Sequence, residues 1–566
     1  MQKTLRALGL LAACTTAIYV AGCTATYGNE TSTQCRSQAD CLDRGADFAD
    51  TTCSIARVCV KLEVAQRACT TNADCTTRAG VPSICRKSDF RCAPLTSTEC
   101  TKIFADKDDL LDDNTIFVGM VLGSEINASF IEPMVELARV QIKRKLGGGL
   151  PPLKPGGPVR PLAVVECAVE PNAAALSGSI AEVRRAVTHL SNLGIPAVLG
   201  PQVTASALQG LAQLISLNMV ALTSNSLTEI SNLADQDLVF RTGFADRDTV
   251  EALTPFLNDQ LYPRMVADGL VAPGGDIRVL PYKMGPNNGG SITDALPAVL
   301  KFNQAKPALE NGANYRVVDF GDAADVVNNP DPGSISGPAI RAGLAYNPNF
   351  ILWASTPGSM AQMIIPFNRQ WPVGTPRPYQ MTVIPAMTAV VVNGLRVINS
   401  DEQRRRFFGF RNFGIGYTDE GFSLFKIELT NLFPDLLNAP VNAFQANFYD
   451  SMYILALAIS SGGENEAVDS TLIRKGIRRV TDPGGVITSF NDPQKGIADL
   501  RAGKNLLLKG VTGLFSFDAK GDRPGFVDTY CVNNGGTPPI PTAVVATGWS
   551  YDLVTKTASG SIQNCN

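Results

Sequence analysis

The sequence has a single histidine, His189, among 566 residues. One histidine supports neither a Ser-His-Asp site away from its own segment nor a cluster of histidine ligands for a metal. Its place beside Leu190 on a helical stripe is typical of a surface or packing residue. The phosphate-binding pattern GxxxxGK[ST] is also absent. No nucleophile, base and orienting group can be assembled from the motifs present, so we expect a protein that is not an enzyme, with no catalytic residues, no cofactor and no metal.

An excess of charge is lacking as well. The chain has 49 Lys and Arg against 52 Asp and Glu, a net charge of -3. Loss of Lys3 and Arg6 with an N-terminal signal would change it to 47 minus 52, or -5. So mild an acidity leaves no electrostatic footprint for nucleic acid. A short basic run at residues 404–406 is typical of a solvated surface patch.

Residues 1–22 have the pattern of a secretory signal peptide. Two basic residues precede an uncharged apolar run, residues 7–22, which is too short and wrongly flanked for a membrane span. The run ends in Val20-Ala21-Gly22-Cys23, which resembles the lipobox of bacterial lipoproteins, where the cysteine becomes the lipidated first residue. We expect lipidation at Cys23, a tether over residues 23–34 and a cell-envelope location, on the outer membrane or the periplasmic face. An ordinary signal with an accidental cysteine is the alternative.

Cysteines form an internal repeat near the N-terminus. Each copy has four cysteines, an Ala-Asp pair before the second cysteine and an arginine three residues after it. Units this small cannot bury a core, so disulfides must replace one. Zinc is the competing interpretation, but zinc ligands usually come as closer pairs. We predict a disulfide-rich module over residues 35–100 that serves as a spacer or for docking. Its repeated cysteines are Cys35, Cys41, Cys53 and Cys59, then Cys69, Cys75, Cys85 and Cys92.

The cysteine count favours complete pairing. Of 14 cysteines, Cys14 leaves with the signal and Cys23 would carry lipid, so an even number remains, as expected in an exported chain. We expect the eight repeat cysteines to pair only among themselves. We further expect Cys100 to pair with Cys167, and Cys531 with Cys565.

The rest of the chain alternates strand and helix patterns. Apolar runs at residues 162–165, 195–200 and 219–222 are separated by helical patterns at 174–193 and 207–217, which is typical of parallel βαβ units. A second series follows and then a return, which predicts two lobes. The other expected strands are 116–121, 277–281, 315–320, 350–353 and 379–384, and the tail 513–555 is strand-rich. The other expected helices are 128–146, 246–261, 420–432, 443–460 and 470–479. The Gly/Pro-rich insertion 147–161 is predicted to be an exposed loop.

Polar loops follow two strands of the first series, at residues 200–206 and 223–226. The carboxyl ends of parallel strands form the ligand crevice of such sheets, so both loops should face the same space. Free N–H groups and the helix dipole there favour a carboxylate or another anion. The alternative is that Thr204 and Ser206 only cap a helix.

Five segments in this order, over four hundred residues, resemble the type I periplasmic binding proteins, and most of all the branched-chain amino-acid-binding branch that serves ABC transporters. The segments are Val198-Leu199-Gly200-Pro201, the loop 223–226, Phe240-Arg241-Thr242-Gly243, Tyr449-Asp450-Ser451 and the stretch 513–523. The resemblance implies an α/β fold of two Rossmann-like lobes with a hinge, preceded by the small disulfide-rich module. It spans about residues 113–555. The implied N-lobe comprises about 113–244 and 417–515, and the C-lobe about 245–416 and 525–566.

The resemblance also implies site residues. In that family, hydroxyls and N–H groups of the N-lobe loops hold the ligand carboxylate, and aromatic residues lie on the C-lobe. The corresponding ligand-binding residues here are Thr204, Ser206, Thr223, Ser224, Ser226, Trp353 and Tyr282. Two departures matter: Leu227 stands where the family carries threonine, and residues 384–387 lack the acidic residue that meets a ligand ammonium.

These patterns predict an exported, lipid-anchored solute-binding protein that takes a small amino-acid-like or other polar or anionic molecule in a cleft between its lobes. It would deliver the solute to an ABC permease or report its presence, and its partners would include the membrane, through the anchor, and possibly an envelope protein. The alternative is an outer-membrane lipoprotein of this fold whose degenerate cleft no longer binds ligand and which regulates cell-wall synthesis through protein contacts.

Overall fold

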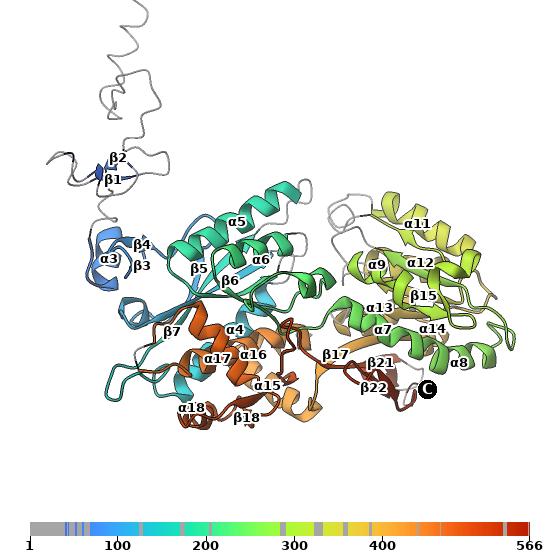
Figure 1. The fold of residues 1–566 in the computed structure, drawn as a ribbon. Coiled ribbons are helices and arrows are strands. Elements are labelled where there is room, and N and C mark those ends of the chain that lie inside the picture. Colours follow the sequence, from blue (N-terminus) through green and yellow to red (C-terminus); the bar gives the residue numbers. More distant parts are fainter. Residues whose placement is uncertain are drawn as a thin grey trace, which may run out of the picture. The chain divides into compact units, whose positions relative to one another are not determined.

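The computed structural model describes most of the chain from residue 35 onward (Figure 1). The described residues are 35, 40–41, 44, 51–53, 59–61, 68–123, 128–169, 176–202, 206–283, 290–321, 332–354, 360–383, 388–437, 441–464, 466–535, 540–563 and 565. The chain divides into two compact units, Met1–Arg67 and Ala68–Asn566. Cys23 and Thr204 lie outside the described residues. Within them, no helix has the length and apolar character needed to cross a membrane.

The first unit contains the first cysteine repeat. Its strands β1 (Thr51–Cys53) and β2 (Cys59–Lys61) pair antiparallel, with Cys53 opposite Cys59. A disulfide joins Cys41 to Cys59, and Cys35 is also disulfide-bonded.

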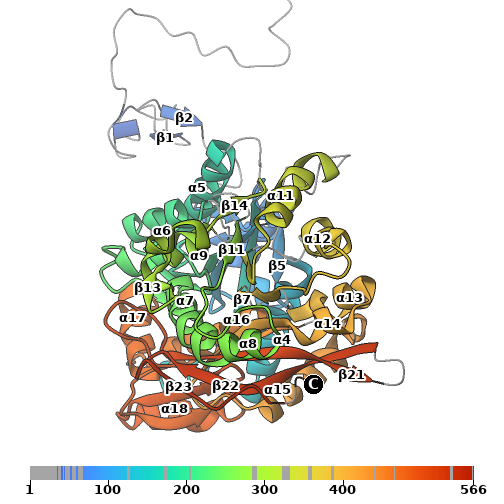
Figure 2. The same ribbon diagram turned by 90° about the vertical axis from the view of Figure 1, so that its right-hand side faces the viewer.

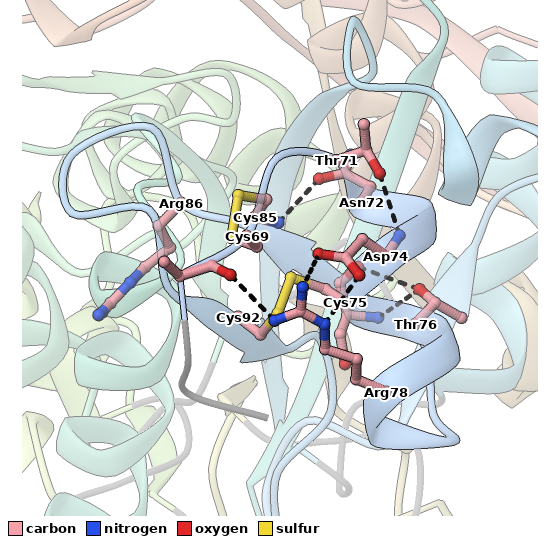
Figure 3. Close-up of a disulfide and its surroundings, with 12 residues drawn as sticks. Cys69, Thr71, Asn72, Asp74, Cys75, Thr76, Arg78, Cys85, Arg86 and Cys92 are labelled. Atoms are coloured by element: carbon pink, nitrogen blue, oxygen red, sulfur yellow. Dashed lines mark hydrogen bonds and ion pairs between the residues drawn. A yellow bond between two sulfur atoms is a disulfide. The ribbon is translucent and has the colours of Figure 1, made fainter. Parts of the chain in front are cut away.

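The second repeat has the same bridge between its second and fourth cysteines, and a further bridge between its first and third. Helix α3 (Asn72–Ala79) precedes the antiparallel strands β3 (Ser83–Cys85) and β4 (Cys92–Pro94), and disulfides join Cys69 to Cys85 and Cys75 to Cys92. Figure 3 shows Arg78 paired with Asp74 one helical turn earlier, at 2.6 Å. In the second copy, the aspartate and the arginine of the repeated pattern are thus partners in an ion pair. For the six cysteines of these three bridges, the expected pairing within the repeats is confirmed.

The second repeat packs on the lobe that follows it. Asn72 N donates to Asp113 Oδ1 at 2.6 Å, and His189 Nε2 lies 3.1 Å from Leu95 O. The predicted Cys100–Cys167 bridge is confirmed and ties the connecting segment to the same lobe. His189 thus has the packing role expected of it. The division of the chain at residue 100 stays a prediction.

The N-lobe is a six-stranded sheet in the order β10-β9-β8-β6-β7-β5. All neighbours are parallel except the edge pair β5/β7. Its strands are β5 (Lys102–Phe104), β6 (Ile116–Gly123), β7 (Leu162–Val169), β8 (Ala197–Gln202), β9 (Val220–Thr223) and β10 (Val239–Arg241). Its helices are α4 (Ala128–Lys145), α5 (Leu176–Asn192), α6 (Ala207–Ser216), α15 (Asp419–Leu432), α16 (Ala443–Ser460), α17 (Ser470–Val480) and α18 (Pro493–Arg501), with short turns η3 (Asp109–Leu111), η4 (Thr228–Asn232) and η9 (Pro434–Leu436). A small sheet, β18 (Val486–Ser489), β19 (Leu506–Gly510) and β20 (Gly513–Leu514), completes it.

Both faces of this sheet are covered, as its largely apolar strands require. Figure 1 shows α5 and α6 on one side of the sheet and α4, α16 and α17 on the other. The helix expected at 174–193 is confirmed as α5, and the apolar stripe in its sequence, which includes Val183, Val187 and Leu190, is fully buried at these three residues. The returning helices α15 to α17 pack on the opposite face.

The C-lobe is an eight-stranded sheet in the order β14-β11-β15-β16-β17-β21-β22-β23, parallel up to β17 and antiparallel beyond it. Figure 2 shows β21 and β22 as long strands across this lobe. Its strands are β11 (Val279–Lys283), β14 (Val318–Asp319), β15 (Phe350–Ala354), β16 (Tyr379–Thr382), β17 (Phe407–Gly414), β21 (Gly525–Gly535), β22 (Ile540–Asp552) and β23 (Thr557–Ser559), beside the hairpin β12 (Lys301–Phe302) and β13 (Lys306–Pro307). Its helices are α7 (Asp246–Pro255), α8 (Tyr262–Ala267), α9 (Gly290–Val299), α11 (Pro332–Tyr346), α12 (Ile365–Gln370), α13 (Thr388–Ile398) and α14 (Asp401–Arg405), with η5 (Phe256–Leu261), η6 (Ala308–Asn314) and η7 (Met360–Ile364). The predicted Cys531–Cys565 bridge is confirmed and fastens the chain end to β21.

Two local expectations are wrong. The insertion 147–161 is not simply exposed, because Leu150 is fully buried and pairs antiparallel with Arg160. The basic run 404–406 is not a solvated patch either. Arg404 is 2% exposed and donates to Val532 O, and Arg406 forms an ion pair with Asp268. The partners of Arg404 and Arg406 are distant in sequence.

A buried carboxylate lies where β5 joins the N-lobe sheet. Glu166 on β7 stands directly opposite Lys102 on β5, and its side chain is 2% exposed. Lys102 Nζ lies 4.0 Å from Glu166 Oε1 and 2.5 Å from Glu132 Oε1 on α4. Burial, helped by the charge of Glu132 and opposed by Lys102, raises the pKa of Glu166 to about 7.

Acidification should therefore stabilise the protein through Glu166. The unfolded chain ionises this group near its usual pKa, whereas the folded protein keeps the proton up to about pH 7. The resulting stability is complete below the unfolded pKa and is lost as the pH rises through the folded one. We expect Glu166→Gln to remove about 1–3 kcal/mol of the pH dependence of the unfolding free energy between pH 5 and 8, after allowance for solvent screening. Urea titrations at both pH values test this, and equal pH slopes in the two proteins would contradict it.

Candidate functional site

The carboxyl ends of β8 and β9 bring together a set of neutral polar side chains. Gln202 ends β8 and Thr223 ends β9, followed by Ser224 and Asn225. These four residues, and Ser206 at the start of α6, are each no more than 4% exposed. The structure thus places the described residues of the two predicted loops at adjacent strand ends, as the parallel sheet requires.

Most hydroxyls of this cluster are already hydrogen-bonded within the protein. Ser206 Oγ lies 3.0 Å from Ser179 Oγ on α5 and does not bond the helix amides. Thr223 Oγ1 accepts from the N–H of Asn225 at 3.1 Å, and Ser224 Oγ donates to Gln202 Oε1 at 3.3 Å. The alternative, that Ser206 only caps α6 through its side chain, is therefore not what the structure shows. In this conformation these side chains position the two loops.

The segment that leaves β10 holds the second loop in place. Thr242 N donates to Thr223 O at 2.8 Å, and Asp246 N donates to Ser226 O at 2.8 Å. A Cβ atom on Gly243 would lie 2.7 Å from Ser224 O, so only glycine permits this approach. Ser226 itself is half-buried. The loop 223–226 is thus fastened to the chain that crosses into the C-lobe.

The two aromatic residues expected on the C-lobe side lie in its core. Tyr282 on β11 and Trp353 on β15 are paired in the sheet and fully buried, with stacked rings 4.5 Å apart. Tyr282 Oη donates to Ala339 O at 3.1 Å, and Trp353 Nε1 donates to Gln380 Oε1 at 2.9 Å. Their polar atoms and ring faces are therefore engaged by the protein itself. As a correction to the expectation, this structure gives both rings a packing role.

Several segments that follow strands in the sequence lie outside the described residues. They are residues 124–127, 170–175, 203–205, 284–289, 322–331, 355–359 and 384–387, which come after β6, β7, β8, β11, β14, β15 and β16. Thr204 and the position of the missing acidic residue fall among them, so both stay predictions.

A buried polar cluster, which the sequence did not predict, lies where the lobes join. In the described part of the chain, three segments cross between the lobes, at 242–245, 415–418 and 515–524. Asp450 on α16 accepts from Val511 N at 2.8 Å, Thr512 N at 3.0 Å and Thr512 Oγ1 at 2.7 Å. Arg523 in turn donates to Thr512 Oγ1 at 2.9 Å. Asp450 is fully buried and Arg523 is 2% exposed.

Burial and the polar contacts shift the pKa values of Asp450 and Arg523 in opposite directions. Burial raises the pKa of Asp450, while the Thr512 hydroxyl, the charge of Arg523 and the two amides lower it. Burial lowers the pKa of Arg523, and the charge of Asp450 opposes that shift. Three of the five segments that carry the resemblance meet in this cluster, because Thr242, Asp450 and Arg523 all lie in it. Asp450, the one acidic residue in a mostly apolar helix, is the sequence signal that could have revealed it.

These features define a two-lobed α/β fold of the periplasmic-binding-protein type, preceded by a disulfide-rich region. No protein-family model matches the sequence, and no curated protein matches it. The fold is similar to the isoleucine-bound substrate-binding protein LivJ of a branched-chain amino acid transporter from Streptococcus pneumoniae. That match has 15% identity and a TM-score of 0.50, and covers 76% of this chain and 99% of that chain.

Other solved structures with this likeness include a leucine-binding protein LivK from Thermotoga maritima, with 15% identity and a TM-score of 0.49 over 76% of this chain and 99% of that chain. A benzoate-bound solute-binding protein of an ABC transporter from R. palustris has 12% identity and a TM-score of 0.48 over 76% and 96% of the two chains. At such identities the likeness shows the fold, and these neighbours are non-enzymatic binding proteins.

Proposed function

We propose that this chain binds a small polar or anionic solute between its lobes, for ABC-type uptake or for sensing. The observation that supports this best is the group of neutral hydrogen-bonding residues at the carboxyl ends of β8 and β9, on a lobe joined by three crossing segments to a second lobe of similar build. Neutral donors at helix N-termini can hold a carboxylate without a buried ion pair. Amino acids are one candidate class, and aromatic carboxylates such as benzoate are another.

A thermal-shift screen tests the proposal directly. A ligand that binds only the folded protein raises its melting temperature. We would screen amino acids, short peptides, sugars and benzoate against the intact chain. A concentration-dependent rise with any of them supports the proposal, and no rise with any class counts against it.

Thr204→Ala should weaken binding of the best ligand about ten- to a hundredfold, because a hydrogen bond to a charged group contributes roughly 1.5–3 kcal/mol. Stability should change little. Calorimetry on both proteins provides the measurement. Thr71→Ala is the matched control, since Thr71 caps α3 by accepting from Asp74 N. It should lower stability by about 1 kcal/mol and leave affinity unchanged. Equal affinities for wild type and Thr204→Ala would show that Thr204 is not a ligand contact.

We also propose that the mature chain begins at a lipidated Cys23, on the basis of Val20-Ala21-Gly22-Cys23. Mass spectrometry of the N-terminal peptide from native membranes should show two or three acyl chains on this residue. Cys23→Ser should release the protein from the membrane fraction. An unmodified thiol at Cys23 in that material would refute the anchor.

A second candidate function is regulation of cell-wall synthesis through protein contacts, with a cleft that no longer binds solute. The internal hydrogen bonds of Ser206, Thr223 and Ser224 favour it. This alternative predicts no thermal shift in the screen together with specific crosslinking to a cell-wall synthase in intact cells. A clear ligand in the screen would argue against it.

A further inference from the structure

One guanidinium lies where the three crossing segments begin or end. Arg523, in the third crossing segment, donates from Nη1 to Thr242 O at 3.1 Å in the first. It donates from Nη2 to Thr512 O at 2.9 Å and from Nε to Leu514 O at 3.0 Å. Its guanidinium also lies 3.6 Å from the centre of the Phe515 ring. The planar, five-donor group of arginine suits such a fork, and lysine could not reproduce it.

The second crossing segment is held at the same point. Gly414, at the end of β17, donates its N–H to Thr512 O at 2.9 Å. A Cβ atom on Gly414 would lie 2.0 Å from Arg523 Nη2, so the guanidinium fills the space beside this backbone. Thr512 O therefore accepts from both Gly414 and Arg523. An end of each crossing segment, or the residue next to that end, therefore lies beside this one side chain.

The N-lobe helix α16 anchors this meeting point. Thr512 Oγ1 accepts from Arg523 Nη1 and donates to Asp450 Oδ2, which forms a relay from guanidinium to carboxylate. Asn447 Oδ1, one turn before Asp450, also accepts from Arg523 Nη1 at 3.2 Å. The crossing segments are thus fixed to α16 as well as to one another.

We propose that Arg523 is a positioning residue that binds the three crossing segments to α16 and so sets the orientation of the C-lobe relative to the N-lobe. A buried group that donates three hydrogen bonds to backbone carbonyls and two more to the side chains of Asn447 and Thr512 restricts the relative rotation of the segments that carry them, because any movement leaves a charged donor unpaired in a dry environment. This role requires no ligand, so its test does not depend on the proposed solute binding.

Distance measurements between the lobes test this role in the ligand-free protein. Nitroxides attached through ketone side chains, which avoid the disulfides, would replace the exposed residues Asn431 on α15 and Arg369 on α12. We expect one narrow distance distribution in the wild type. Arg523→Lys should at least double its width, because the charge remains while the fork to Thr242, Thr512 and Leu514 is lost.

Arg411→Lys is the matched control. Arg411 forms a forked pair with Asp528 between β17 and β21, entirely within the C-lobe. Its replacement should lower the denaturation midpoint without widening the distribution. If Arg523→Lys does not fold, Thr512→Val removes the hydroxyl relay with little change in volume and should widen the distribution in the same way. A broad wild-type distribution, or equal widths in the Arg411 variant and either test variant, would overturn the proposal.

Discussion

Replacing Asp450 with alanine should destabilise the N-lobe by about 3–5 kcal/mol, the usual cost of removing one partner from a buried charged network. Asp450 is fully buried and accepts from Val511 N, Thr512 N and Thr512 Oγ1. The variant leaves these donors unpaired and Arg523 without its nearby carboxylate. Urea denaturation followed by far-UV circular dichroism measures the loss.

A surface carboxylate provides the control, because its removal shows the effect of losing a carboxylate that is not buried. Asp435→Ala, on the exposed turn η9 of the same lobe, should leave the denaturation midpoint unchanged. Asp450→Asn keeps the shape and part of the acceptor capacity, so it should fall between the two. If Asp450→Ala proved as stable as Asp435→Ala, the buried cluster would contribute nothing to folding.

Trp353→Ala should destabilise the C-lobe by about 3–5 kcal/mol, because it opens a cavity in a packed core. Trp353 is fully buried, stacks on Tyr282, and meets the edge of Phe367 with ring centroids 5.7 Å apart. Its Nε1–H is paired with Gln380. Chemical denaturation monitored by near-UV circular dichroism provides the measurement.

The smaller change Trp353→Phe separates packing from ligand binding. It should cost less stability than alanine, since most of the ring volume is retained. Affinity for the best ligand of the screen should stay within twofold of wild type if Trp353 only packs the core. A large loss of affinity in a folded Trp353→Phe protein would instead restore its ligand-binding role.

The sequence predicted the elements well where periodicity is strong. Helix α16 occupies the predicted residues, and the predicted buried stripe on α5 holds because a 3.6-residue period fixes which face meets the sheet. Cysteine number and spacing were equally informative, since short repeats cannot be stabilised without bridges within each copy.

The direction of single side chains could not be predicted in the same way. Strands of a parallel sheet are apolar on both faces, so nothing in the run around Tyr282 or Trp353 distinguishes a core position from a site position. The prediction that the basic run 404–406 is a solvated patch was wrong for another reason. Arg404 bonds Val532, 128 residues away, and Arg406 bonds Asp268, 138 residues away. Such pairings depend on the tertiary fold and leave no local pattern.

The route of the chain also determines which fragments can be produced on their own. Helices α15, α16 and α17 cover one face of the N-lobe sheet, although the whole parallel part of the C-lobe precedes them in sequence. A protein truncated after β10 would leave Met120, Leu199 and Leu222 of that face exposed to water, and such a surface promotes aggregation. A self-contained N-lobe for crystallisation or binding assays therefore has to join the segment ending at β10 directly to the segment from α15 through β20, with the intervening 170-odd residues (roughly a domain's length) removed.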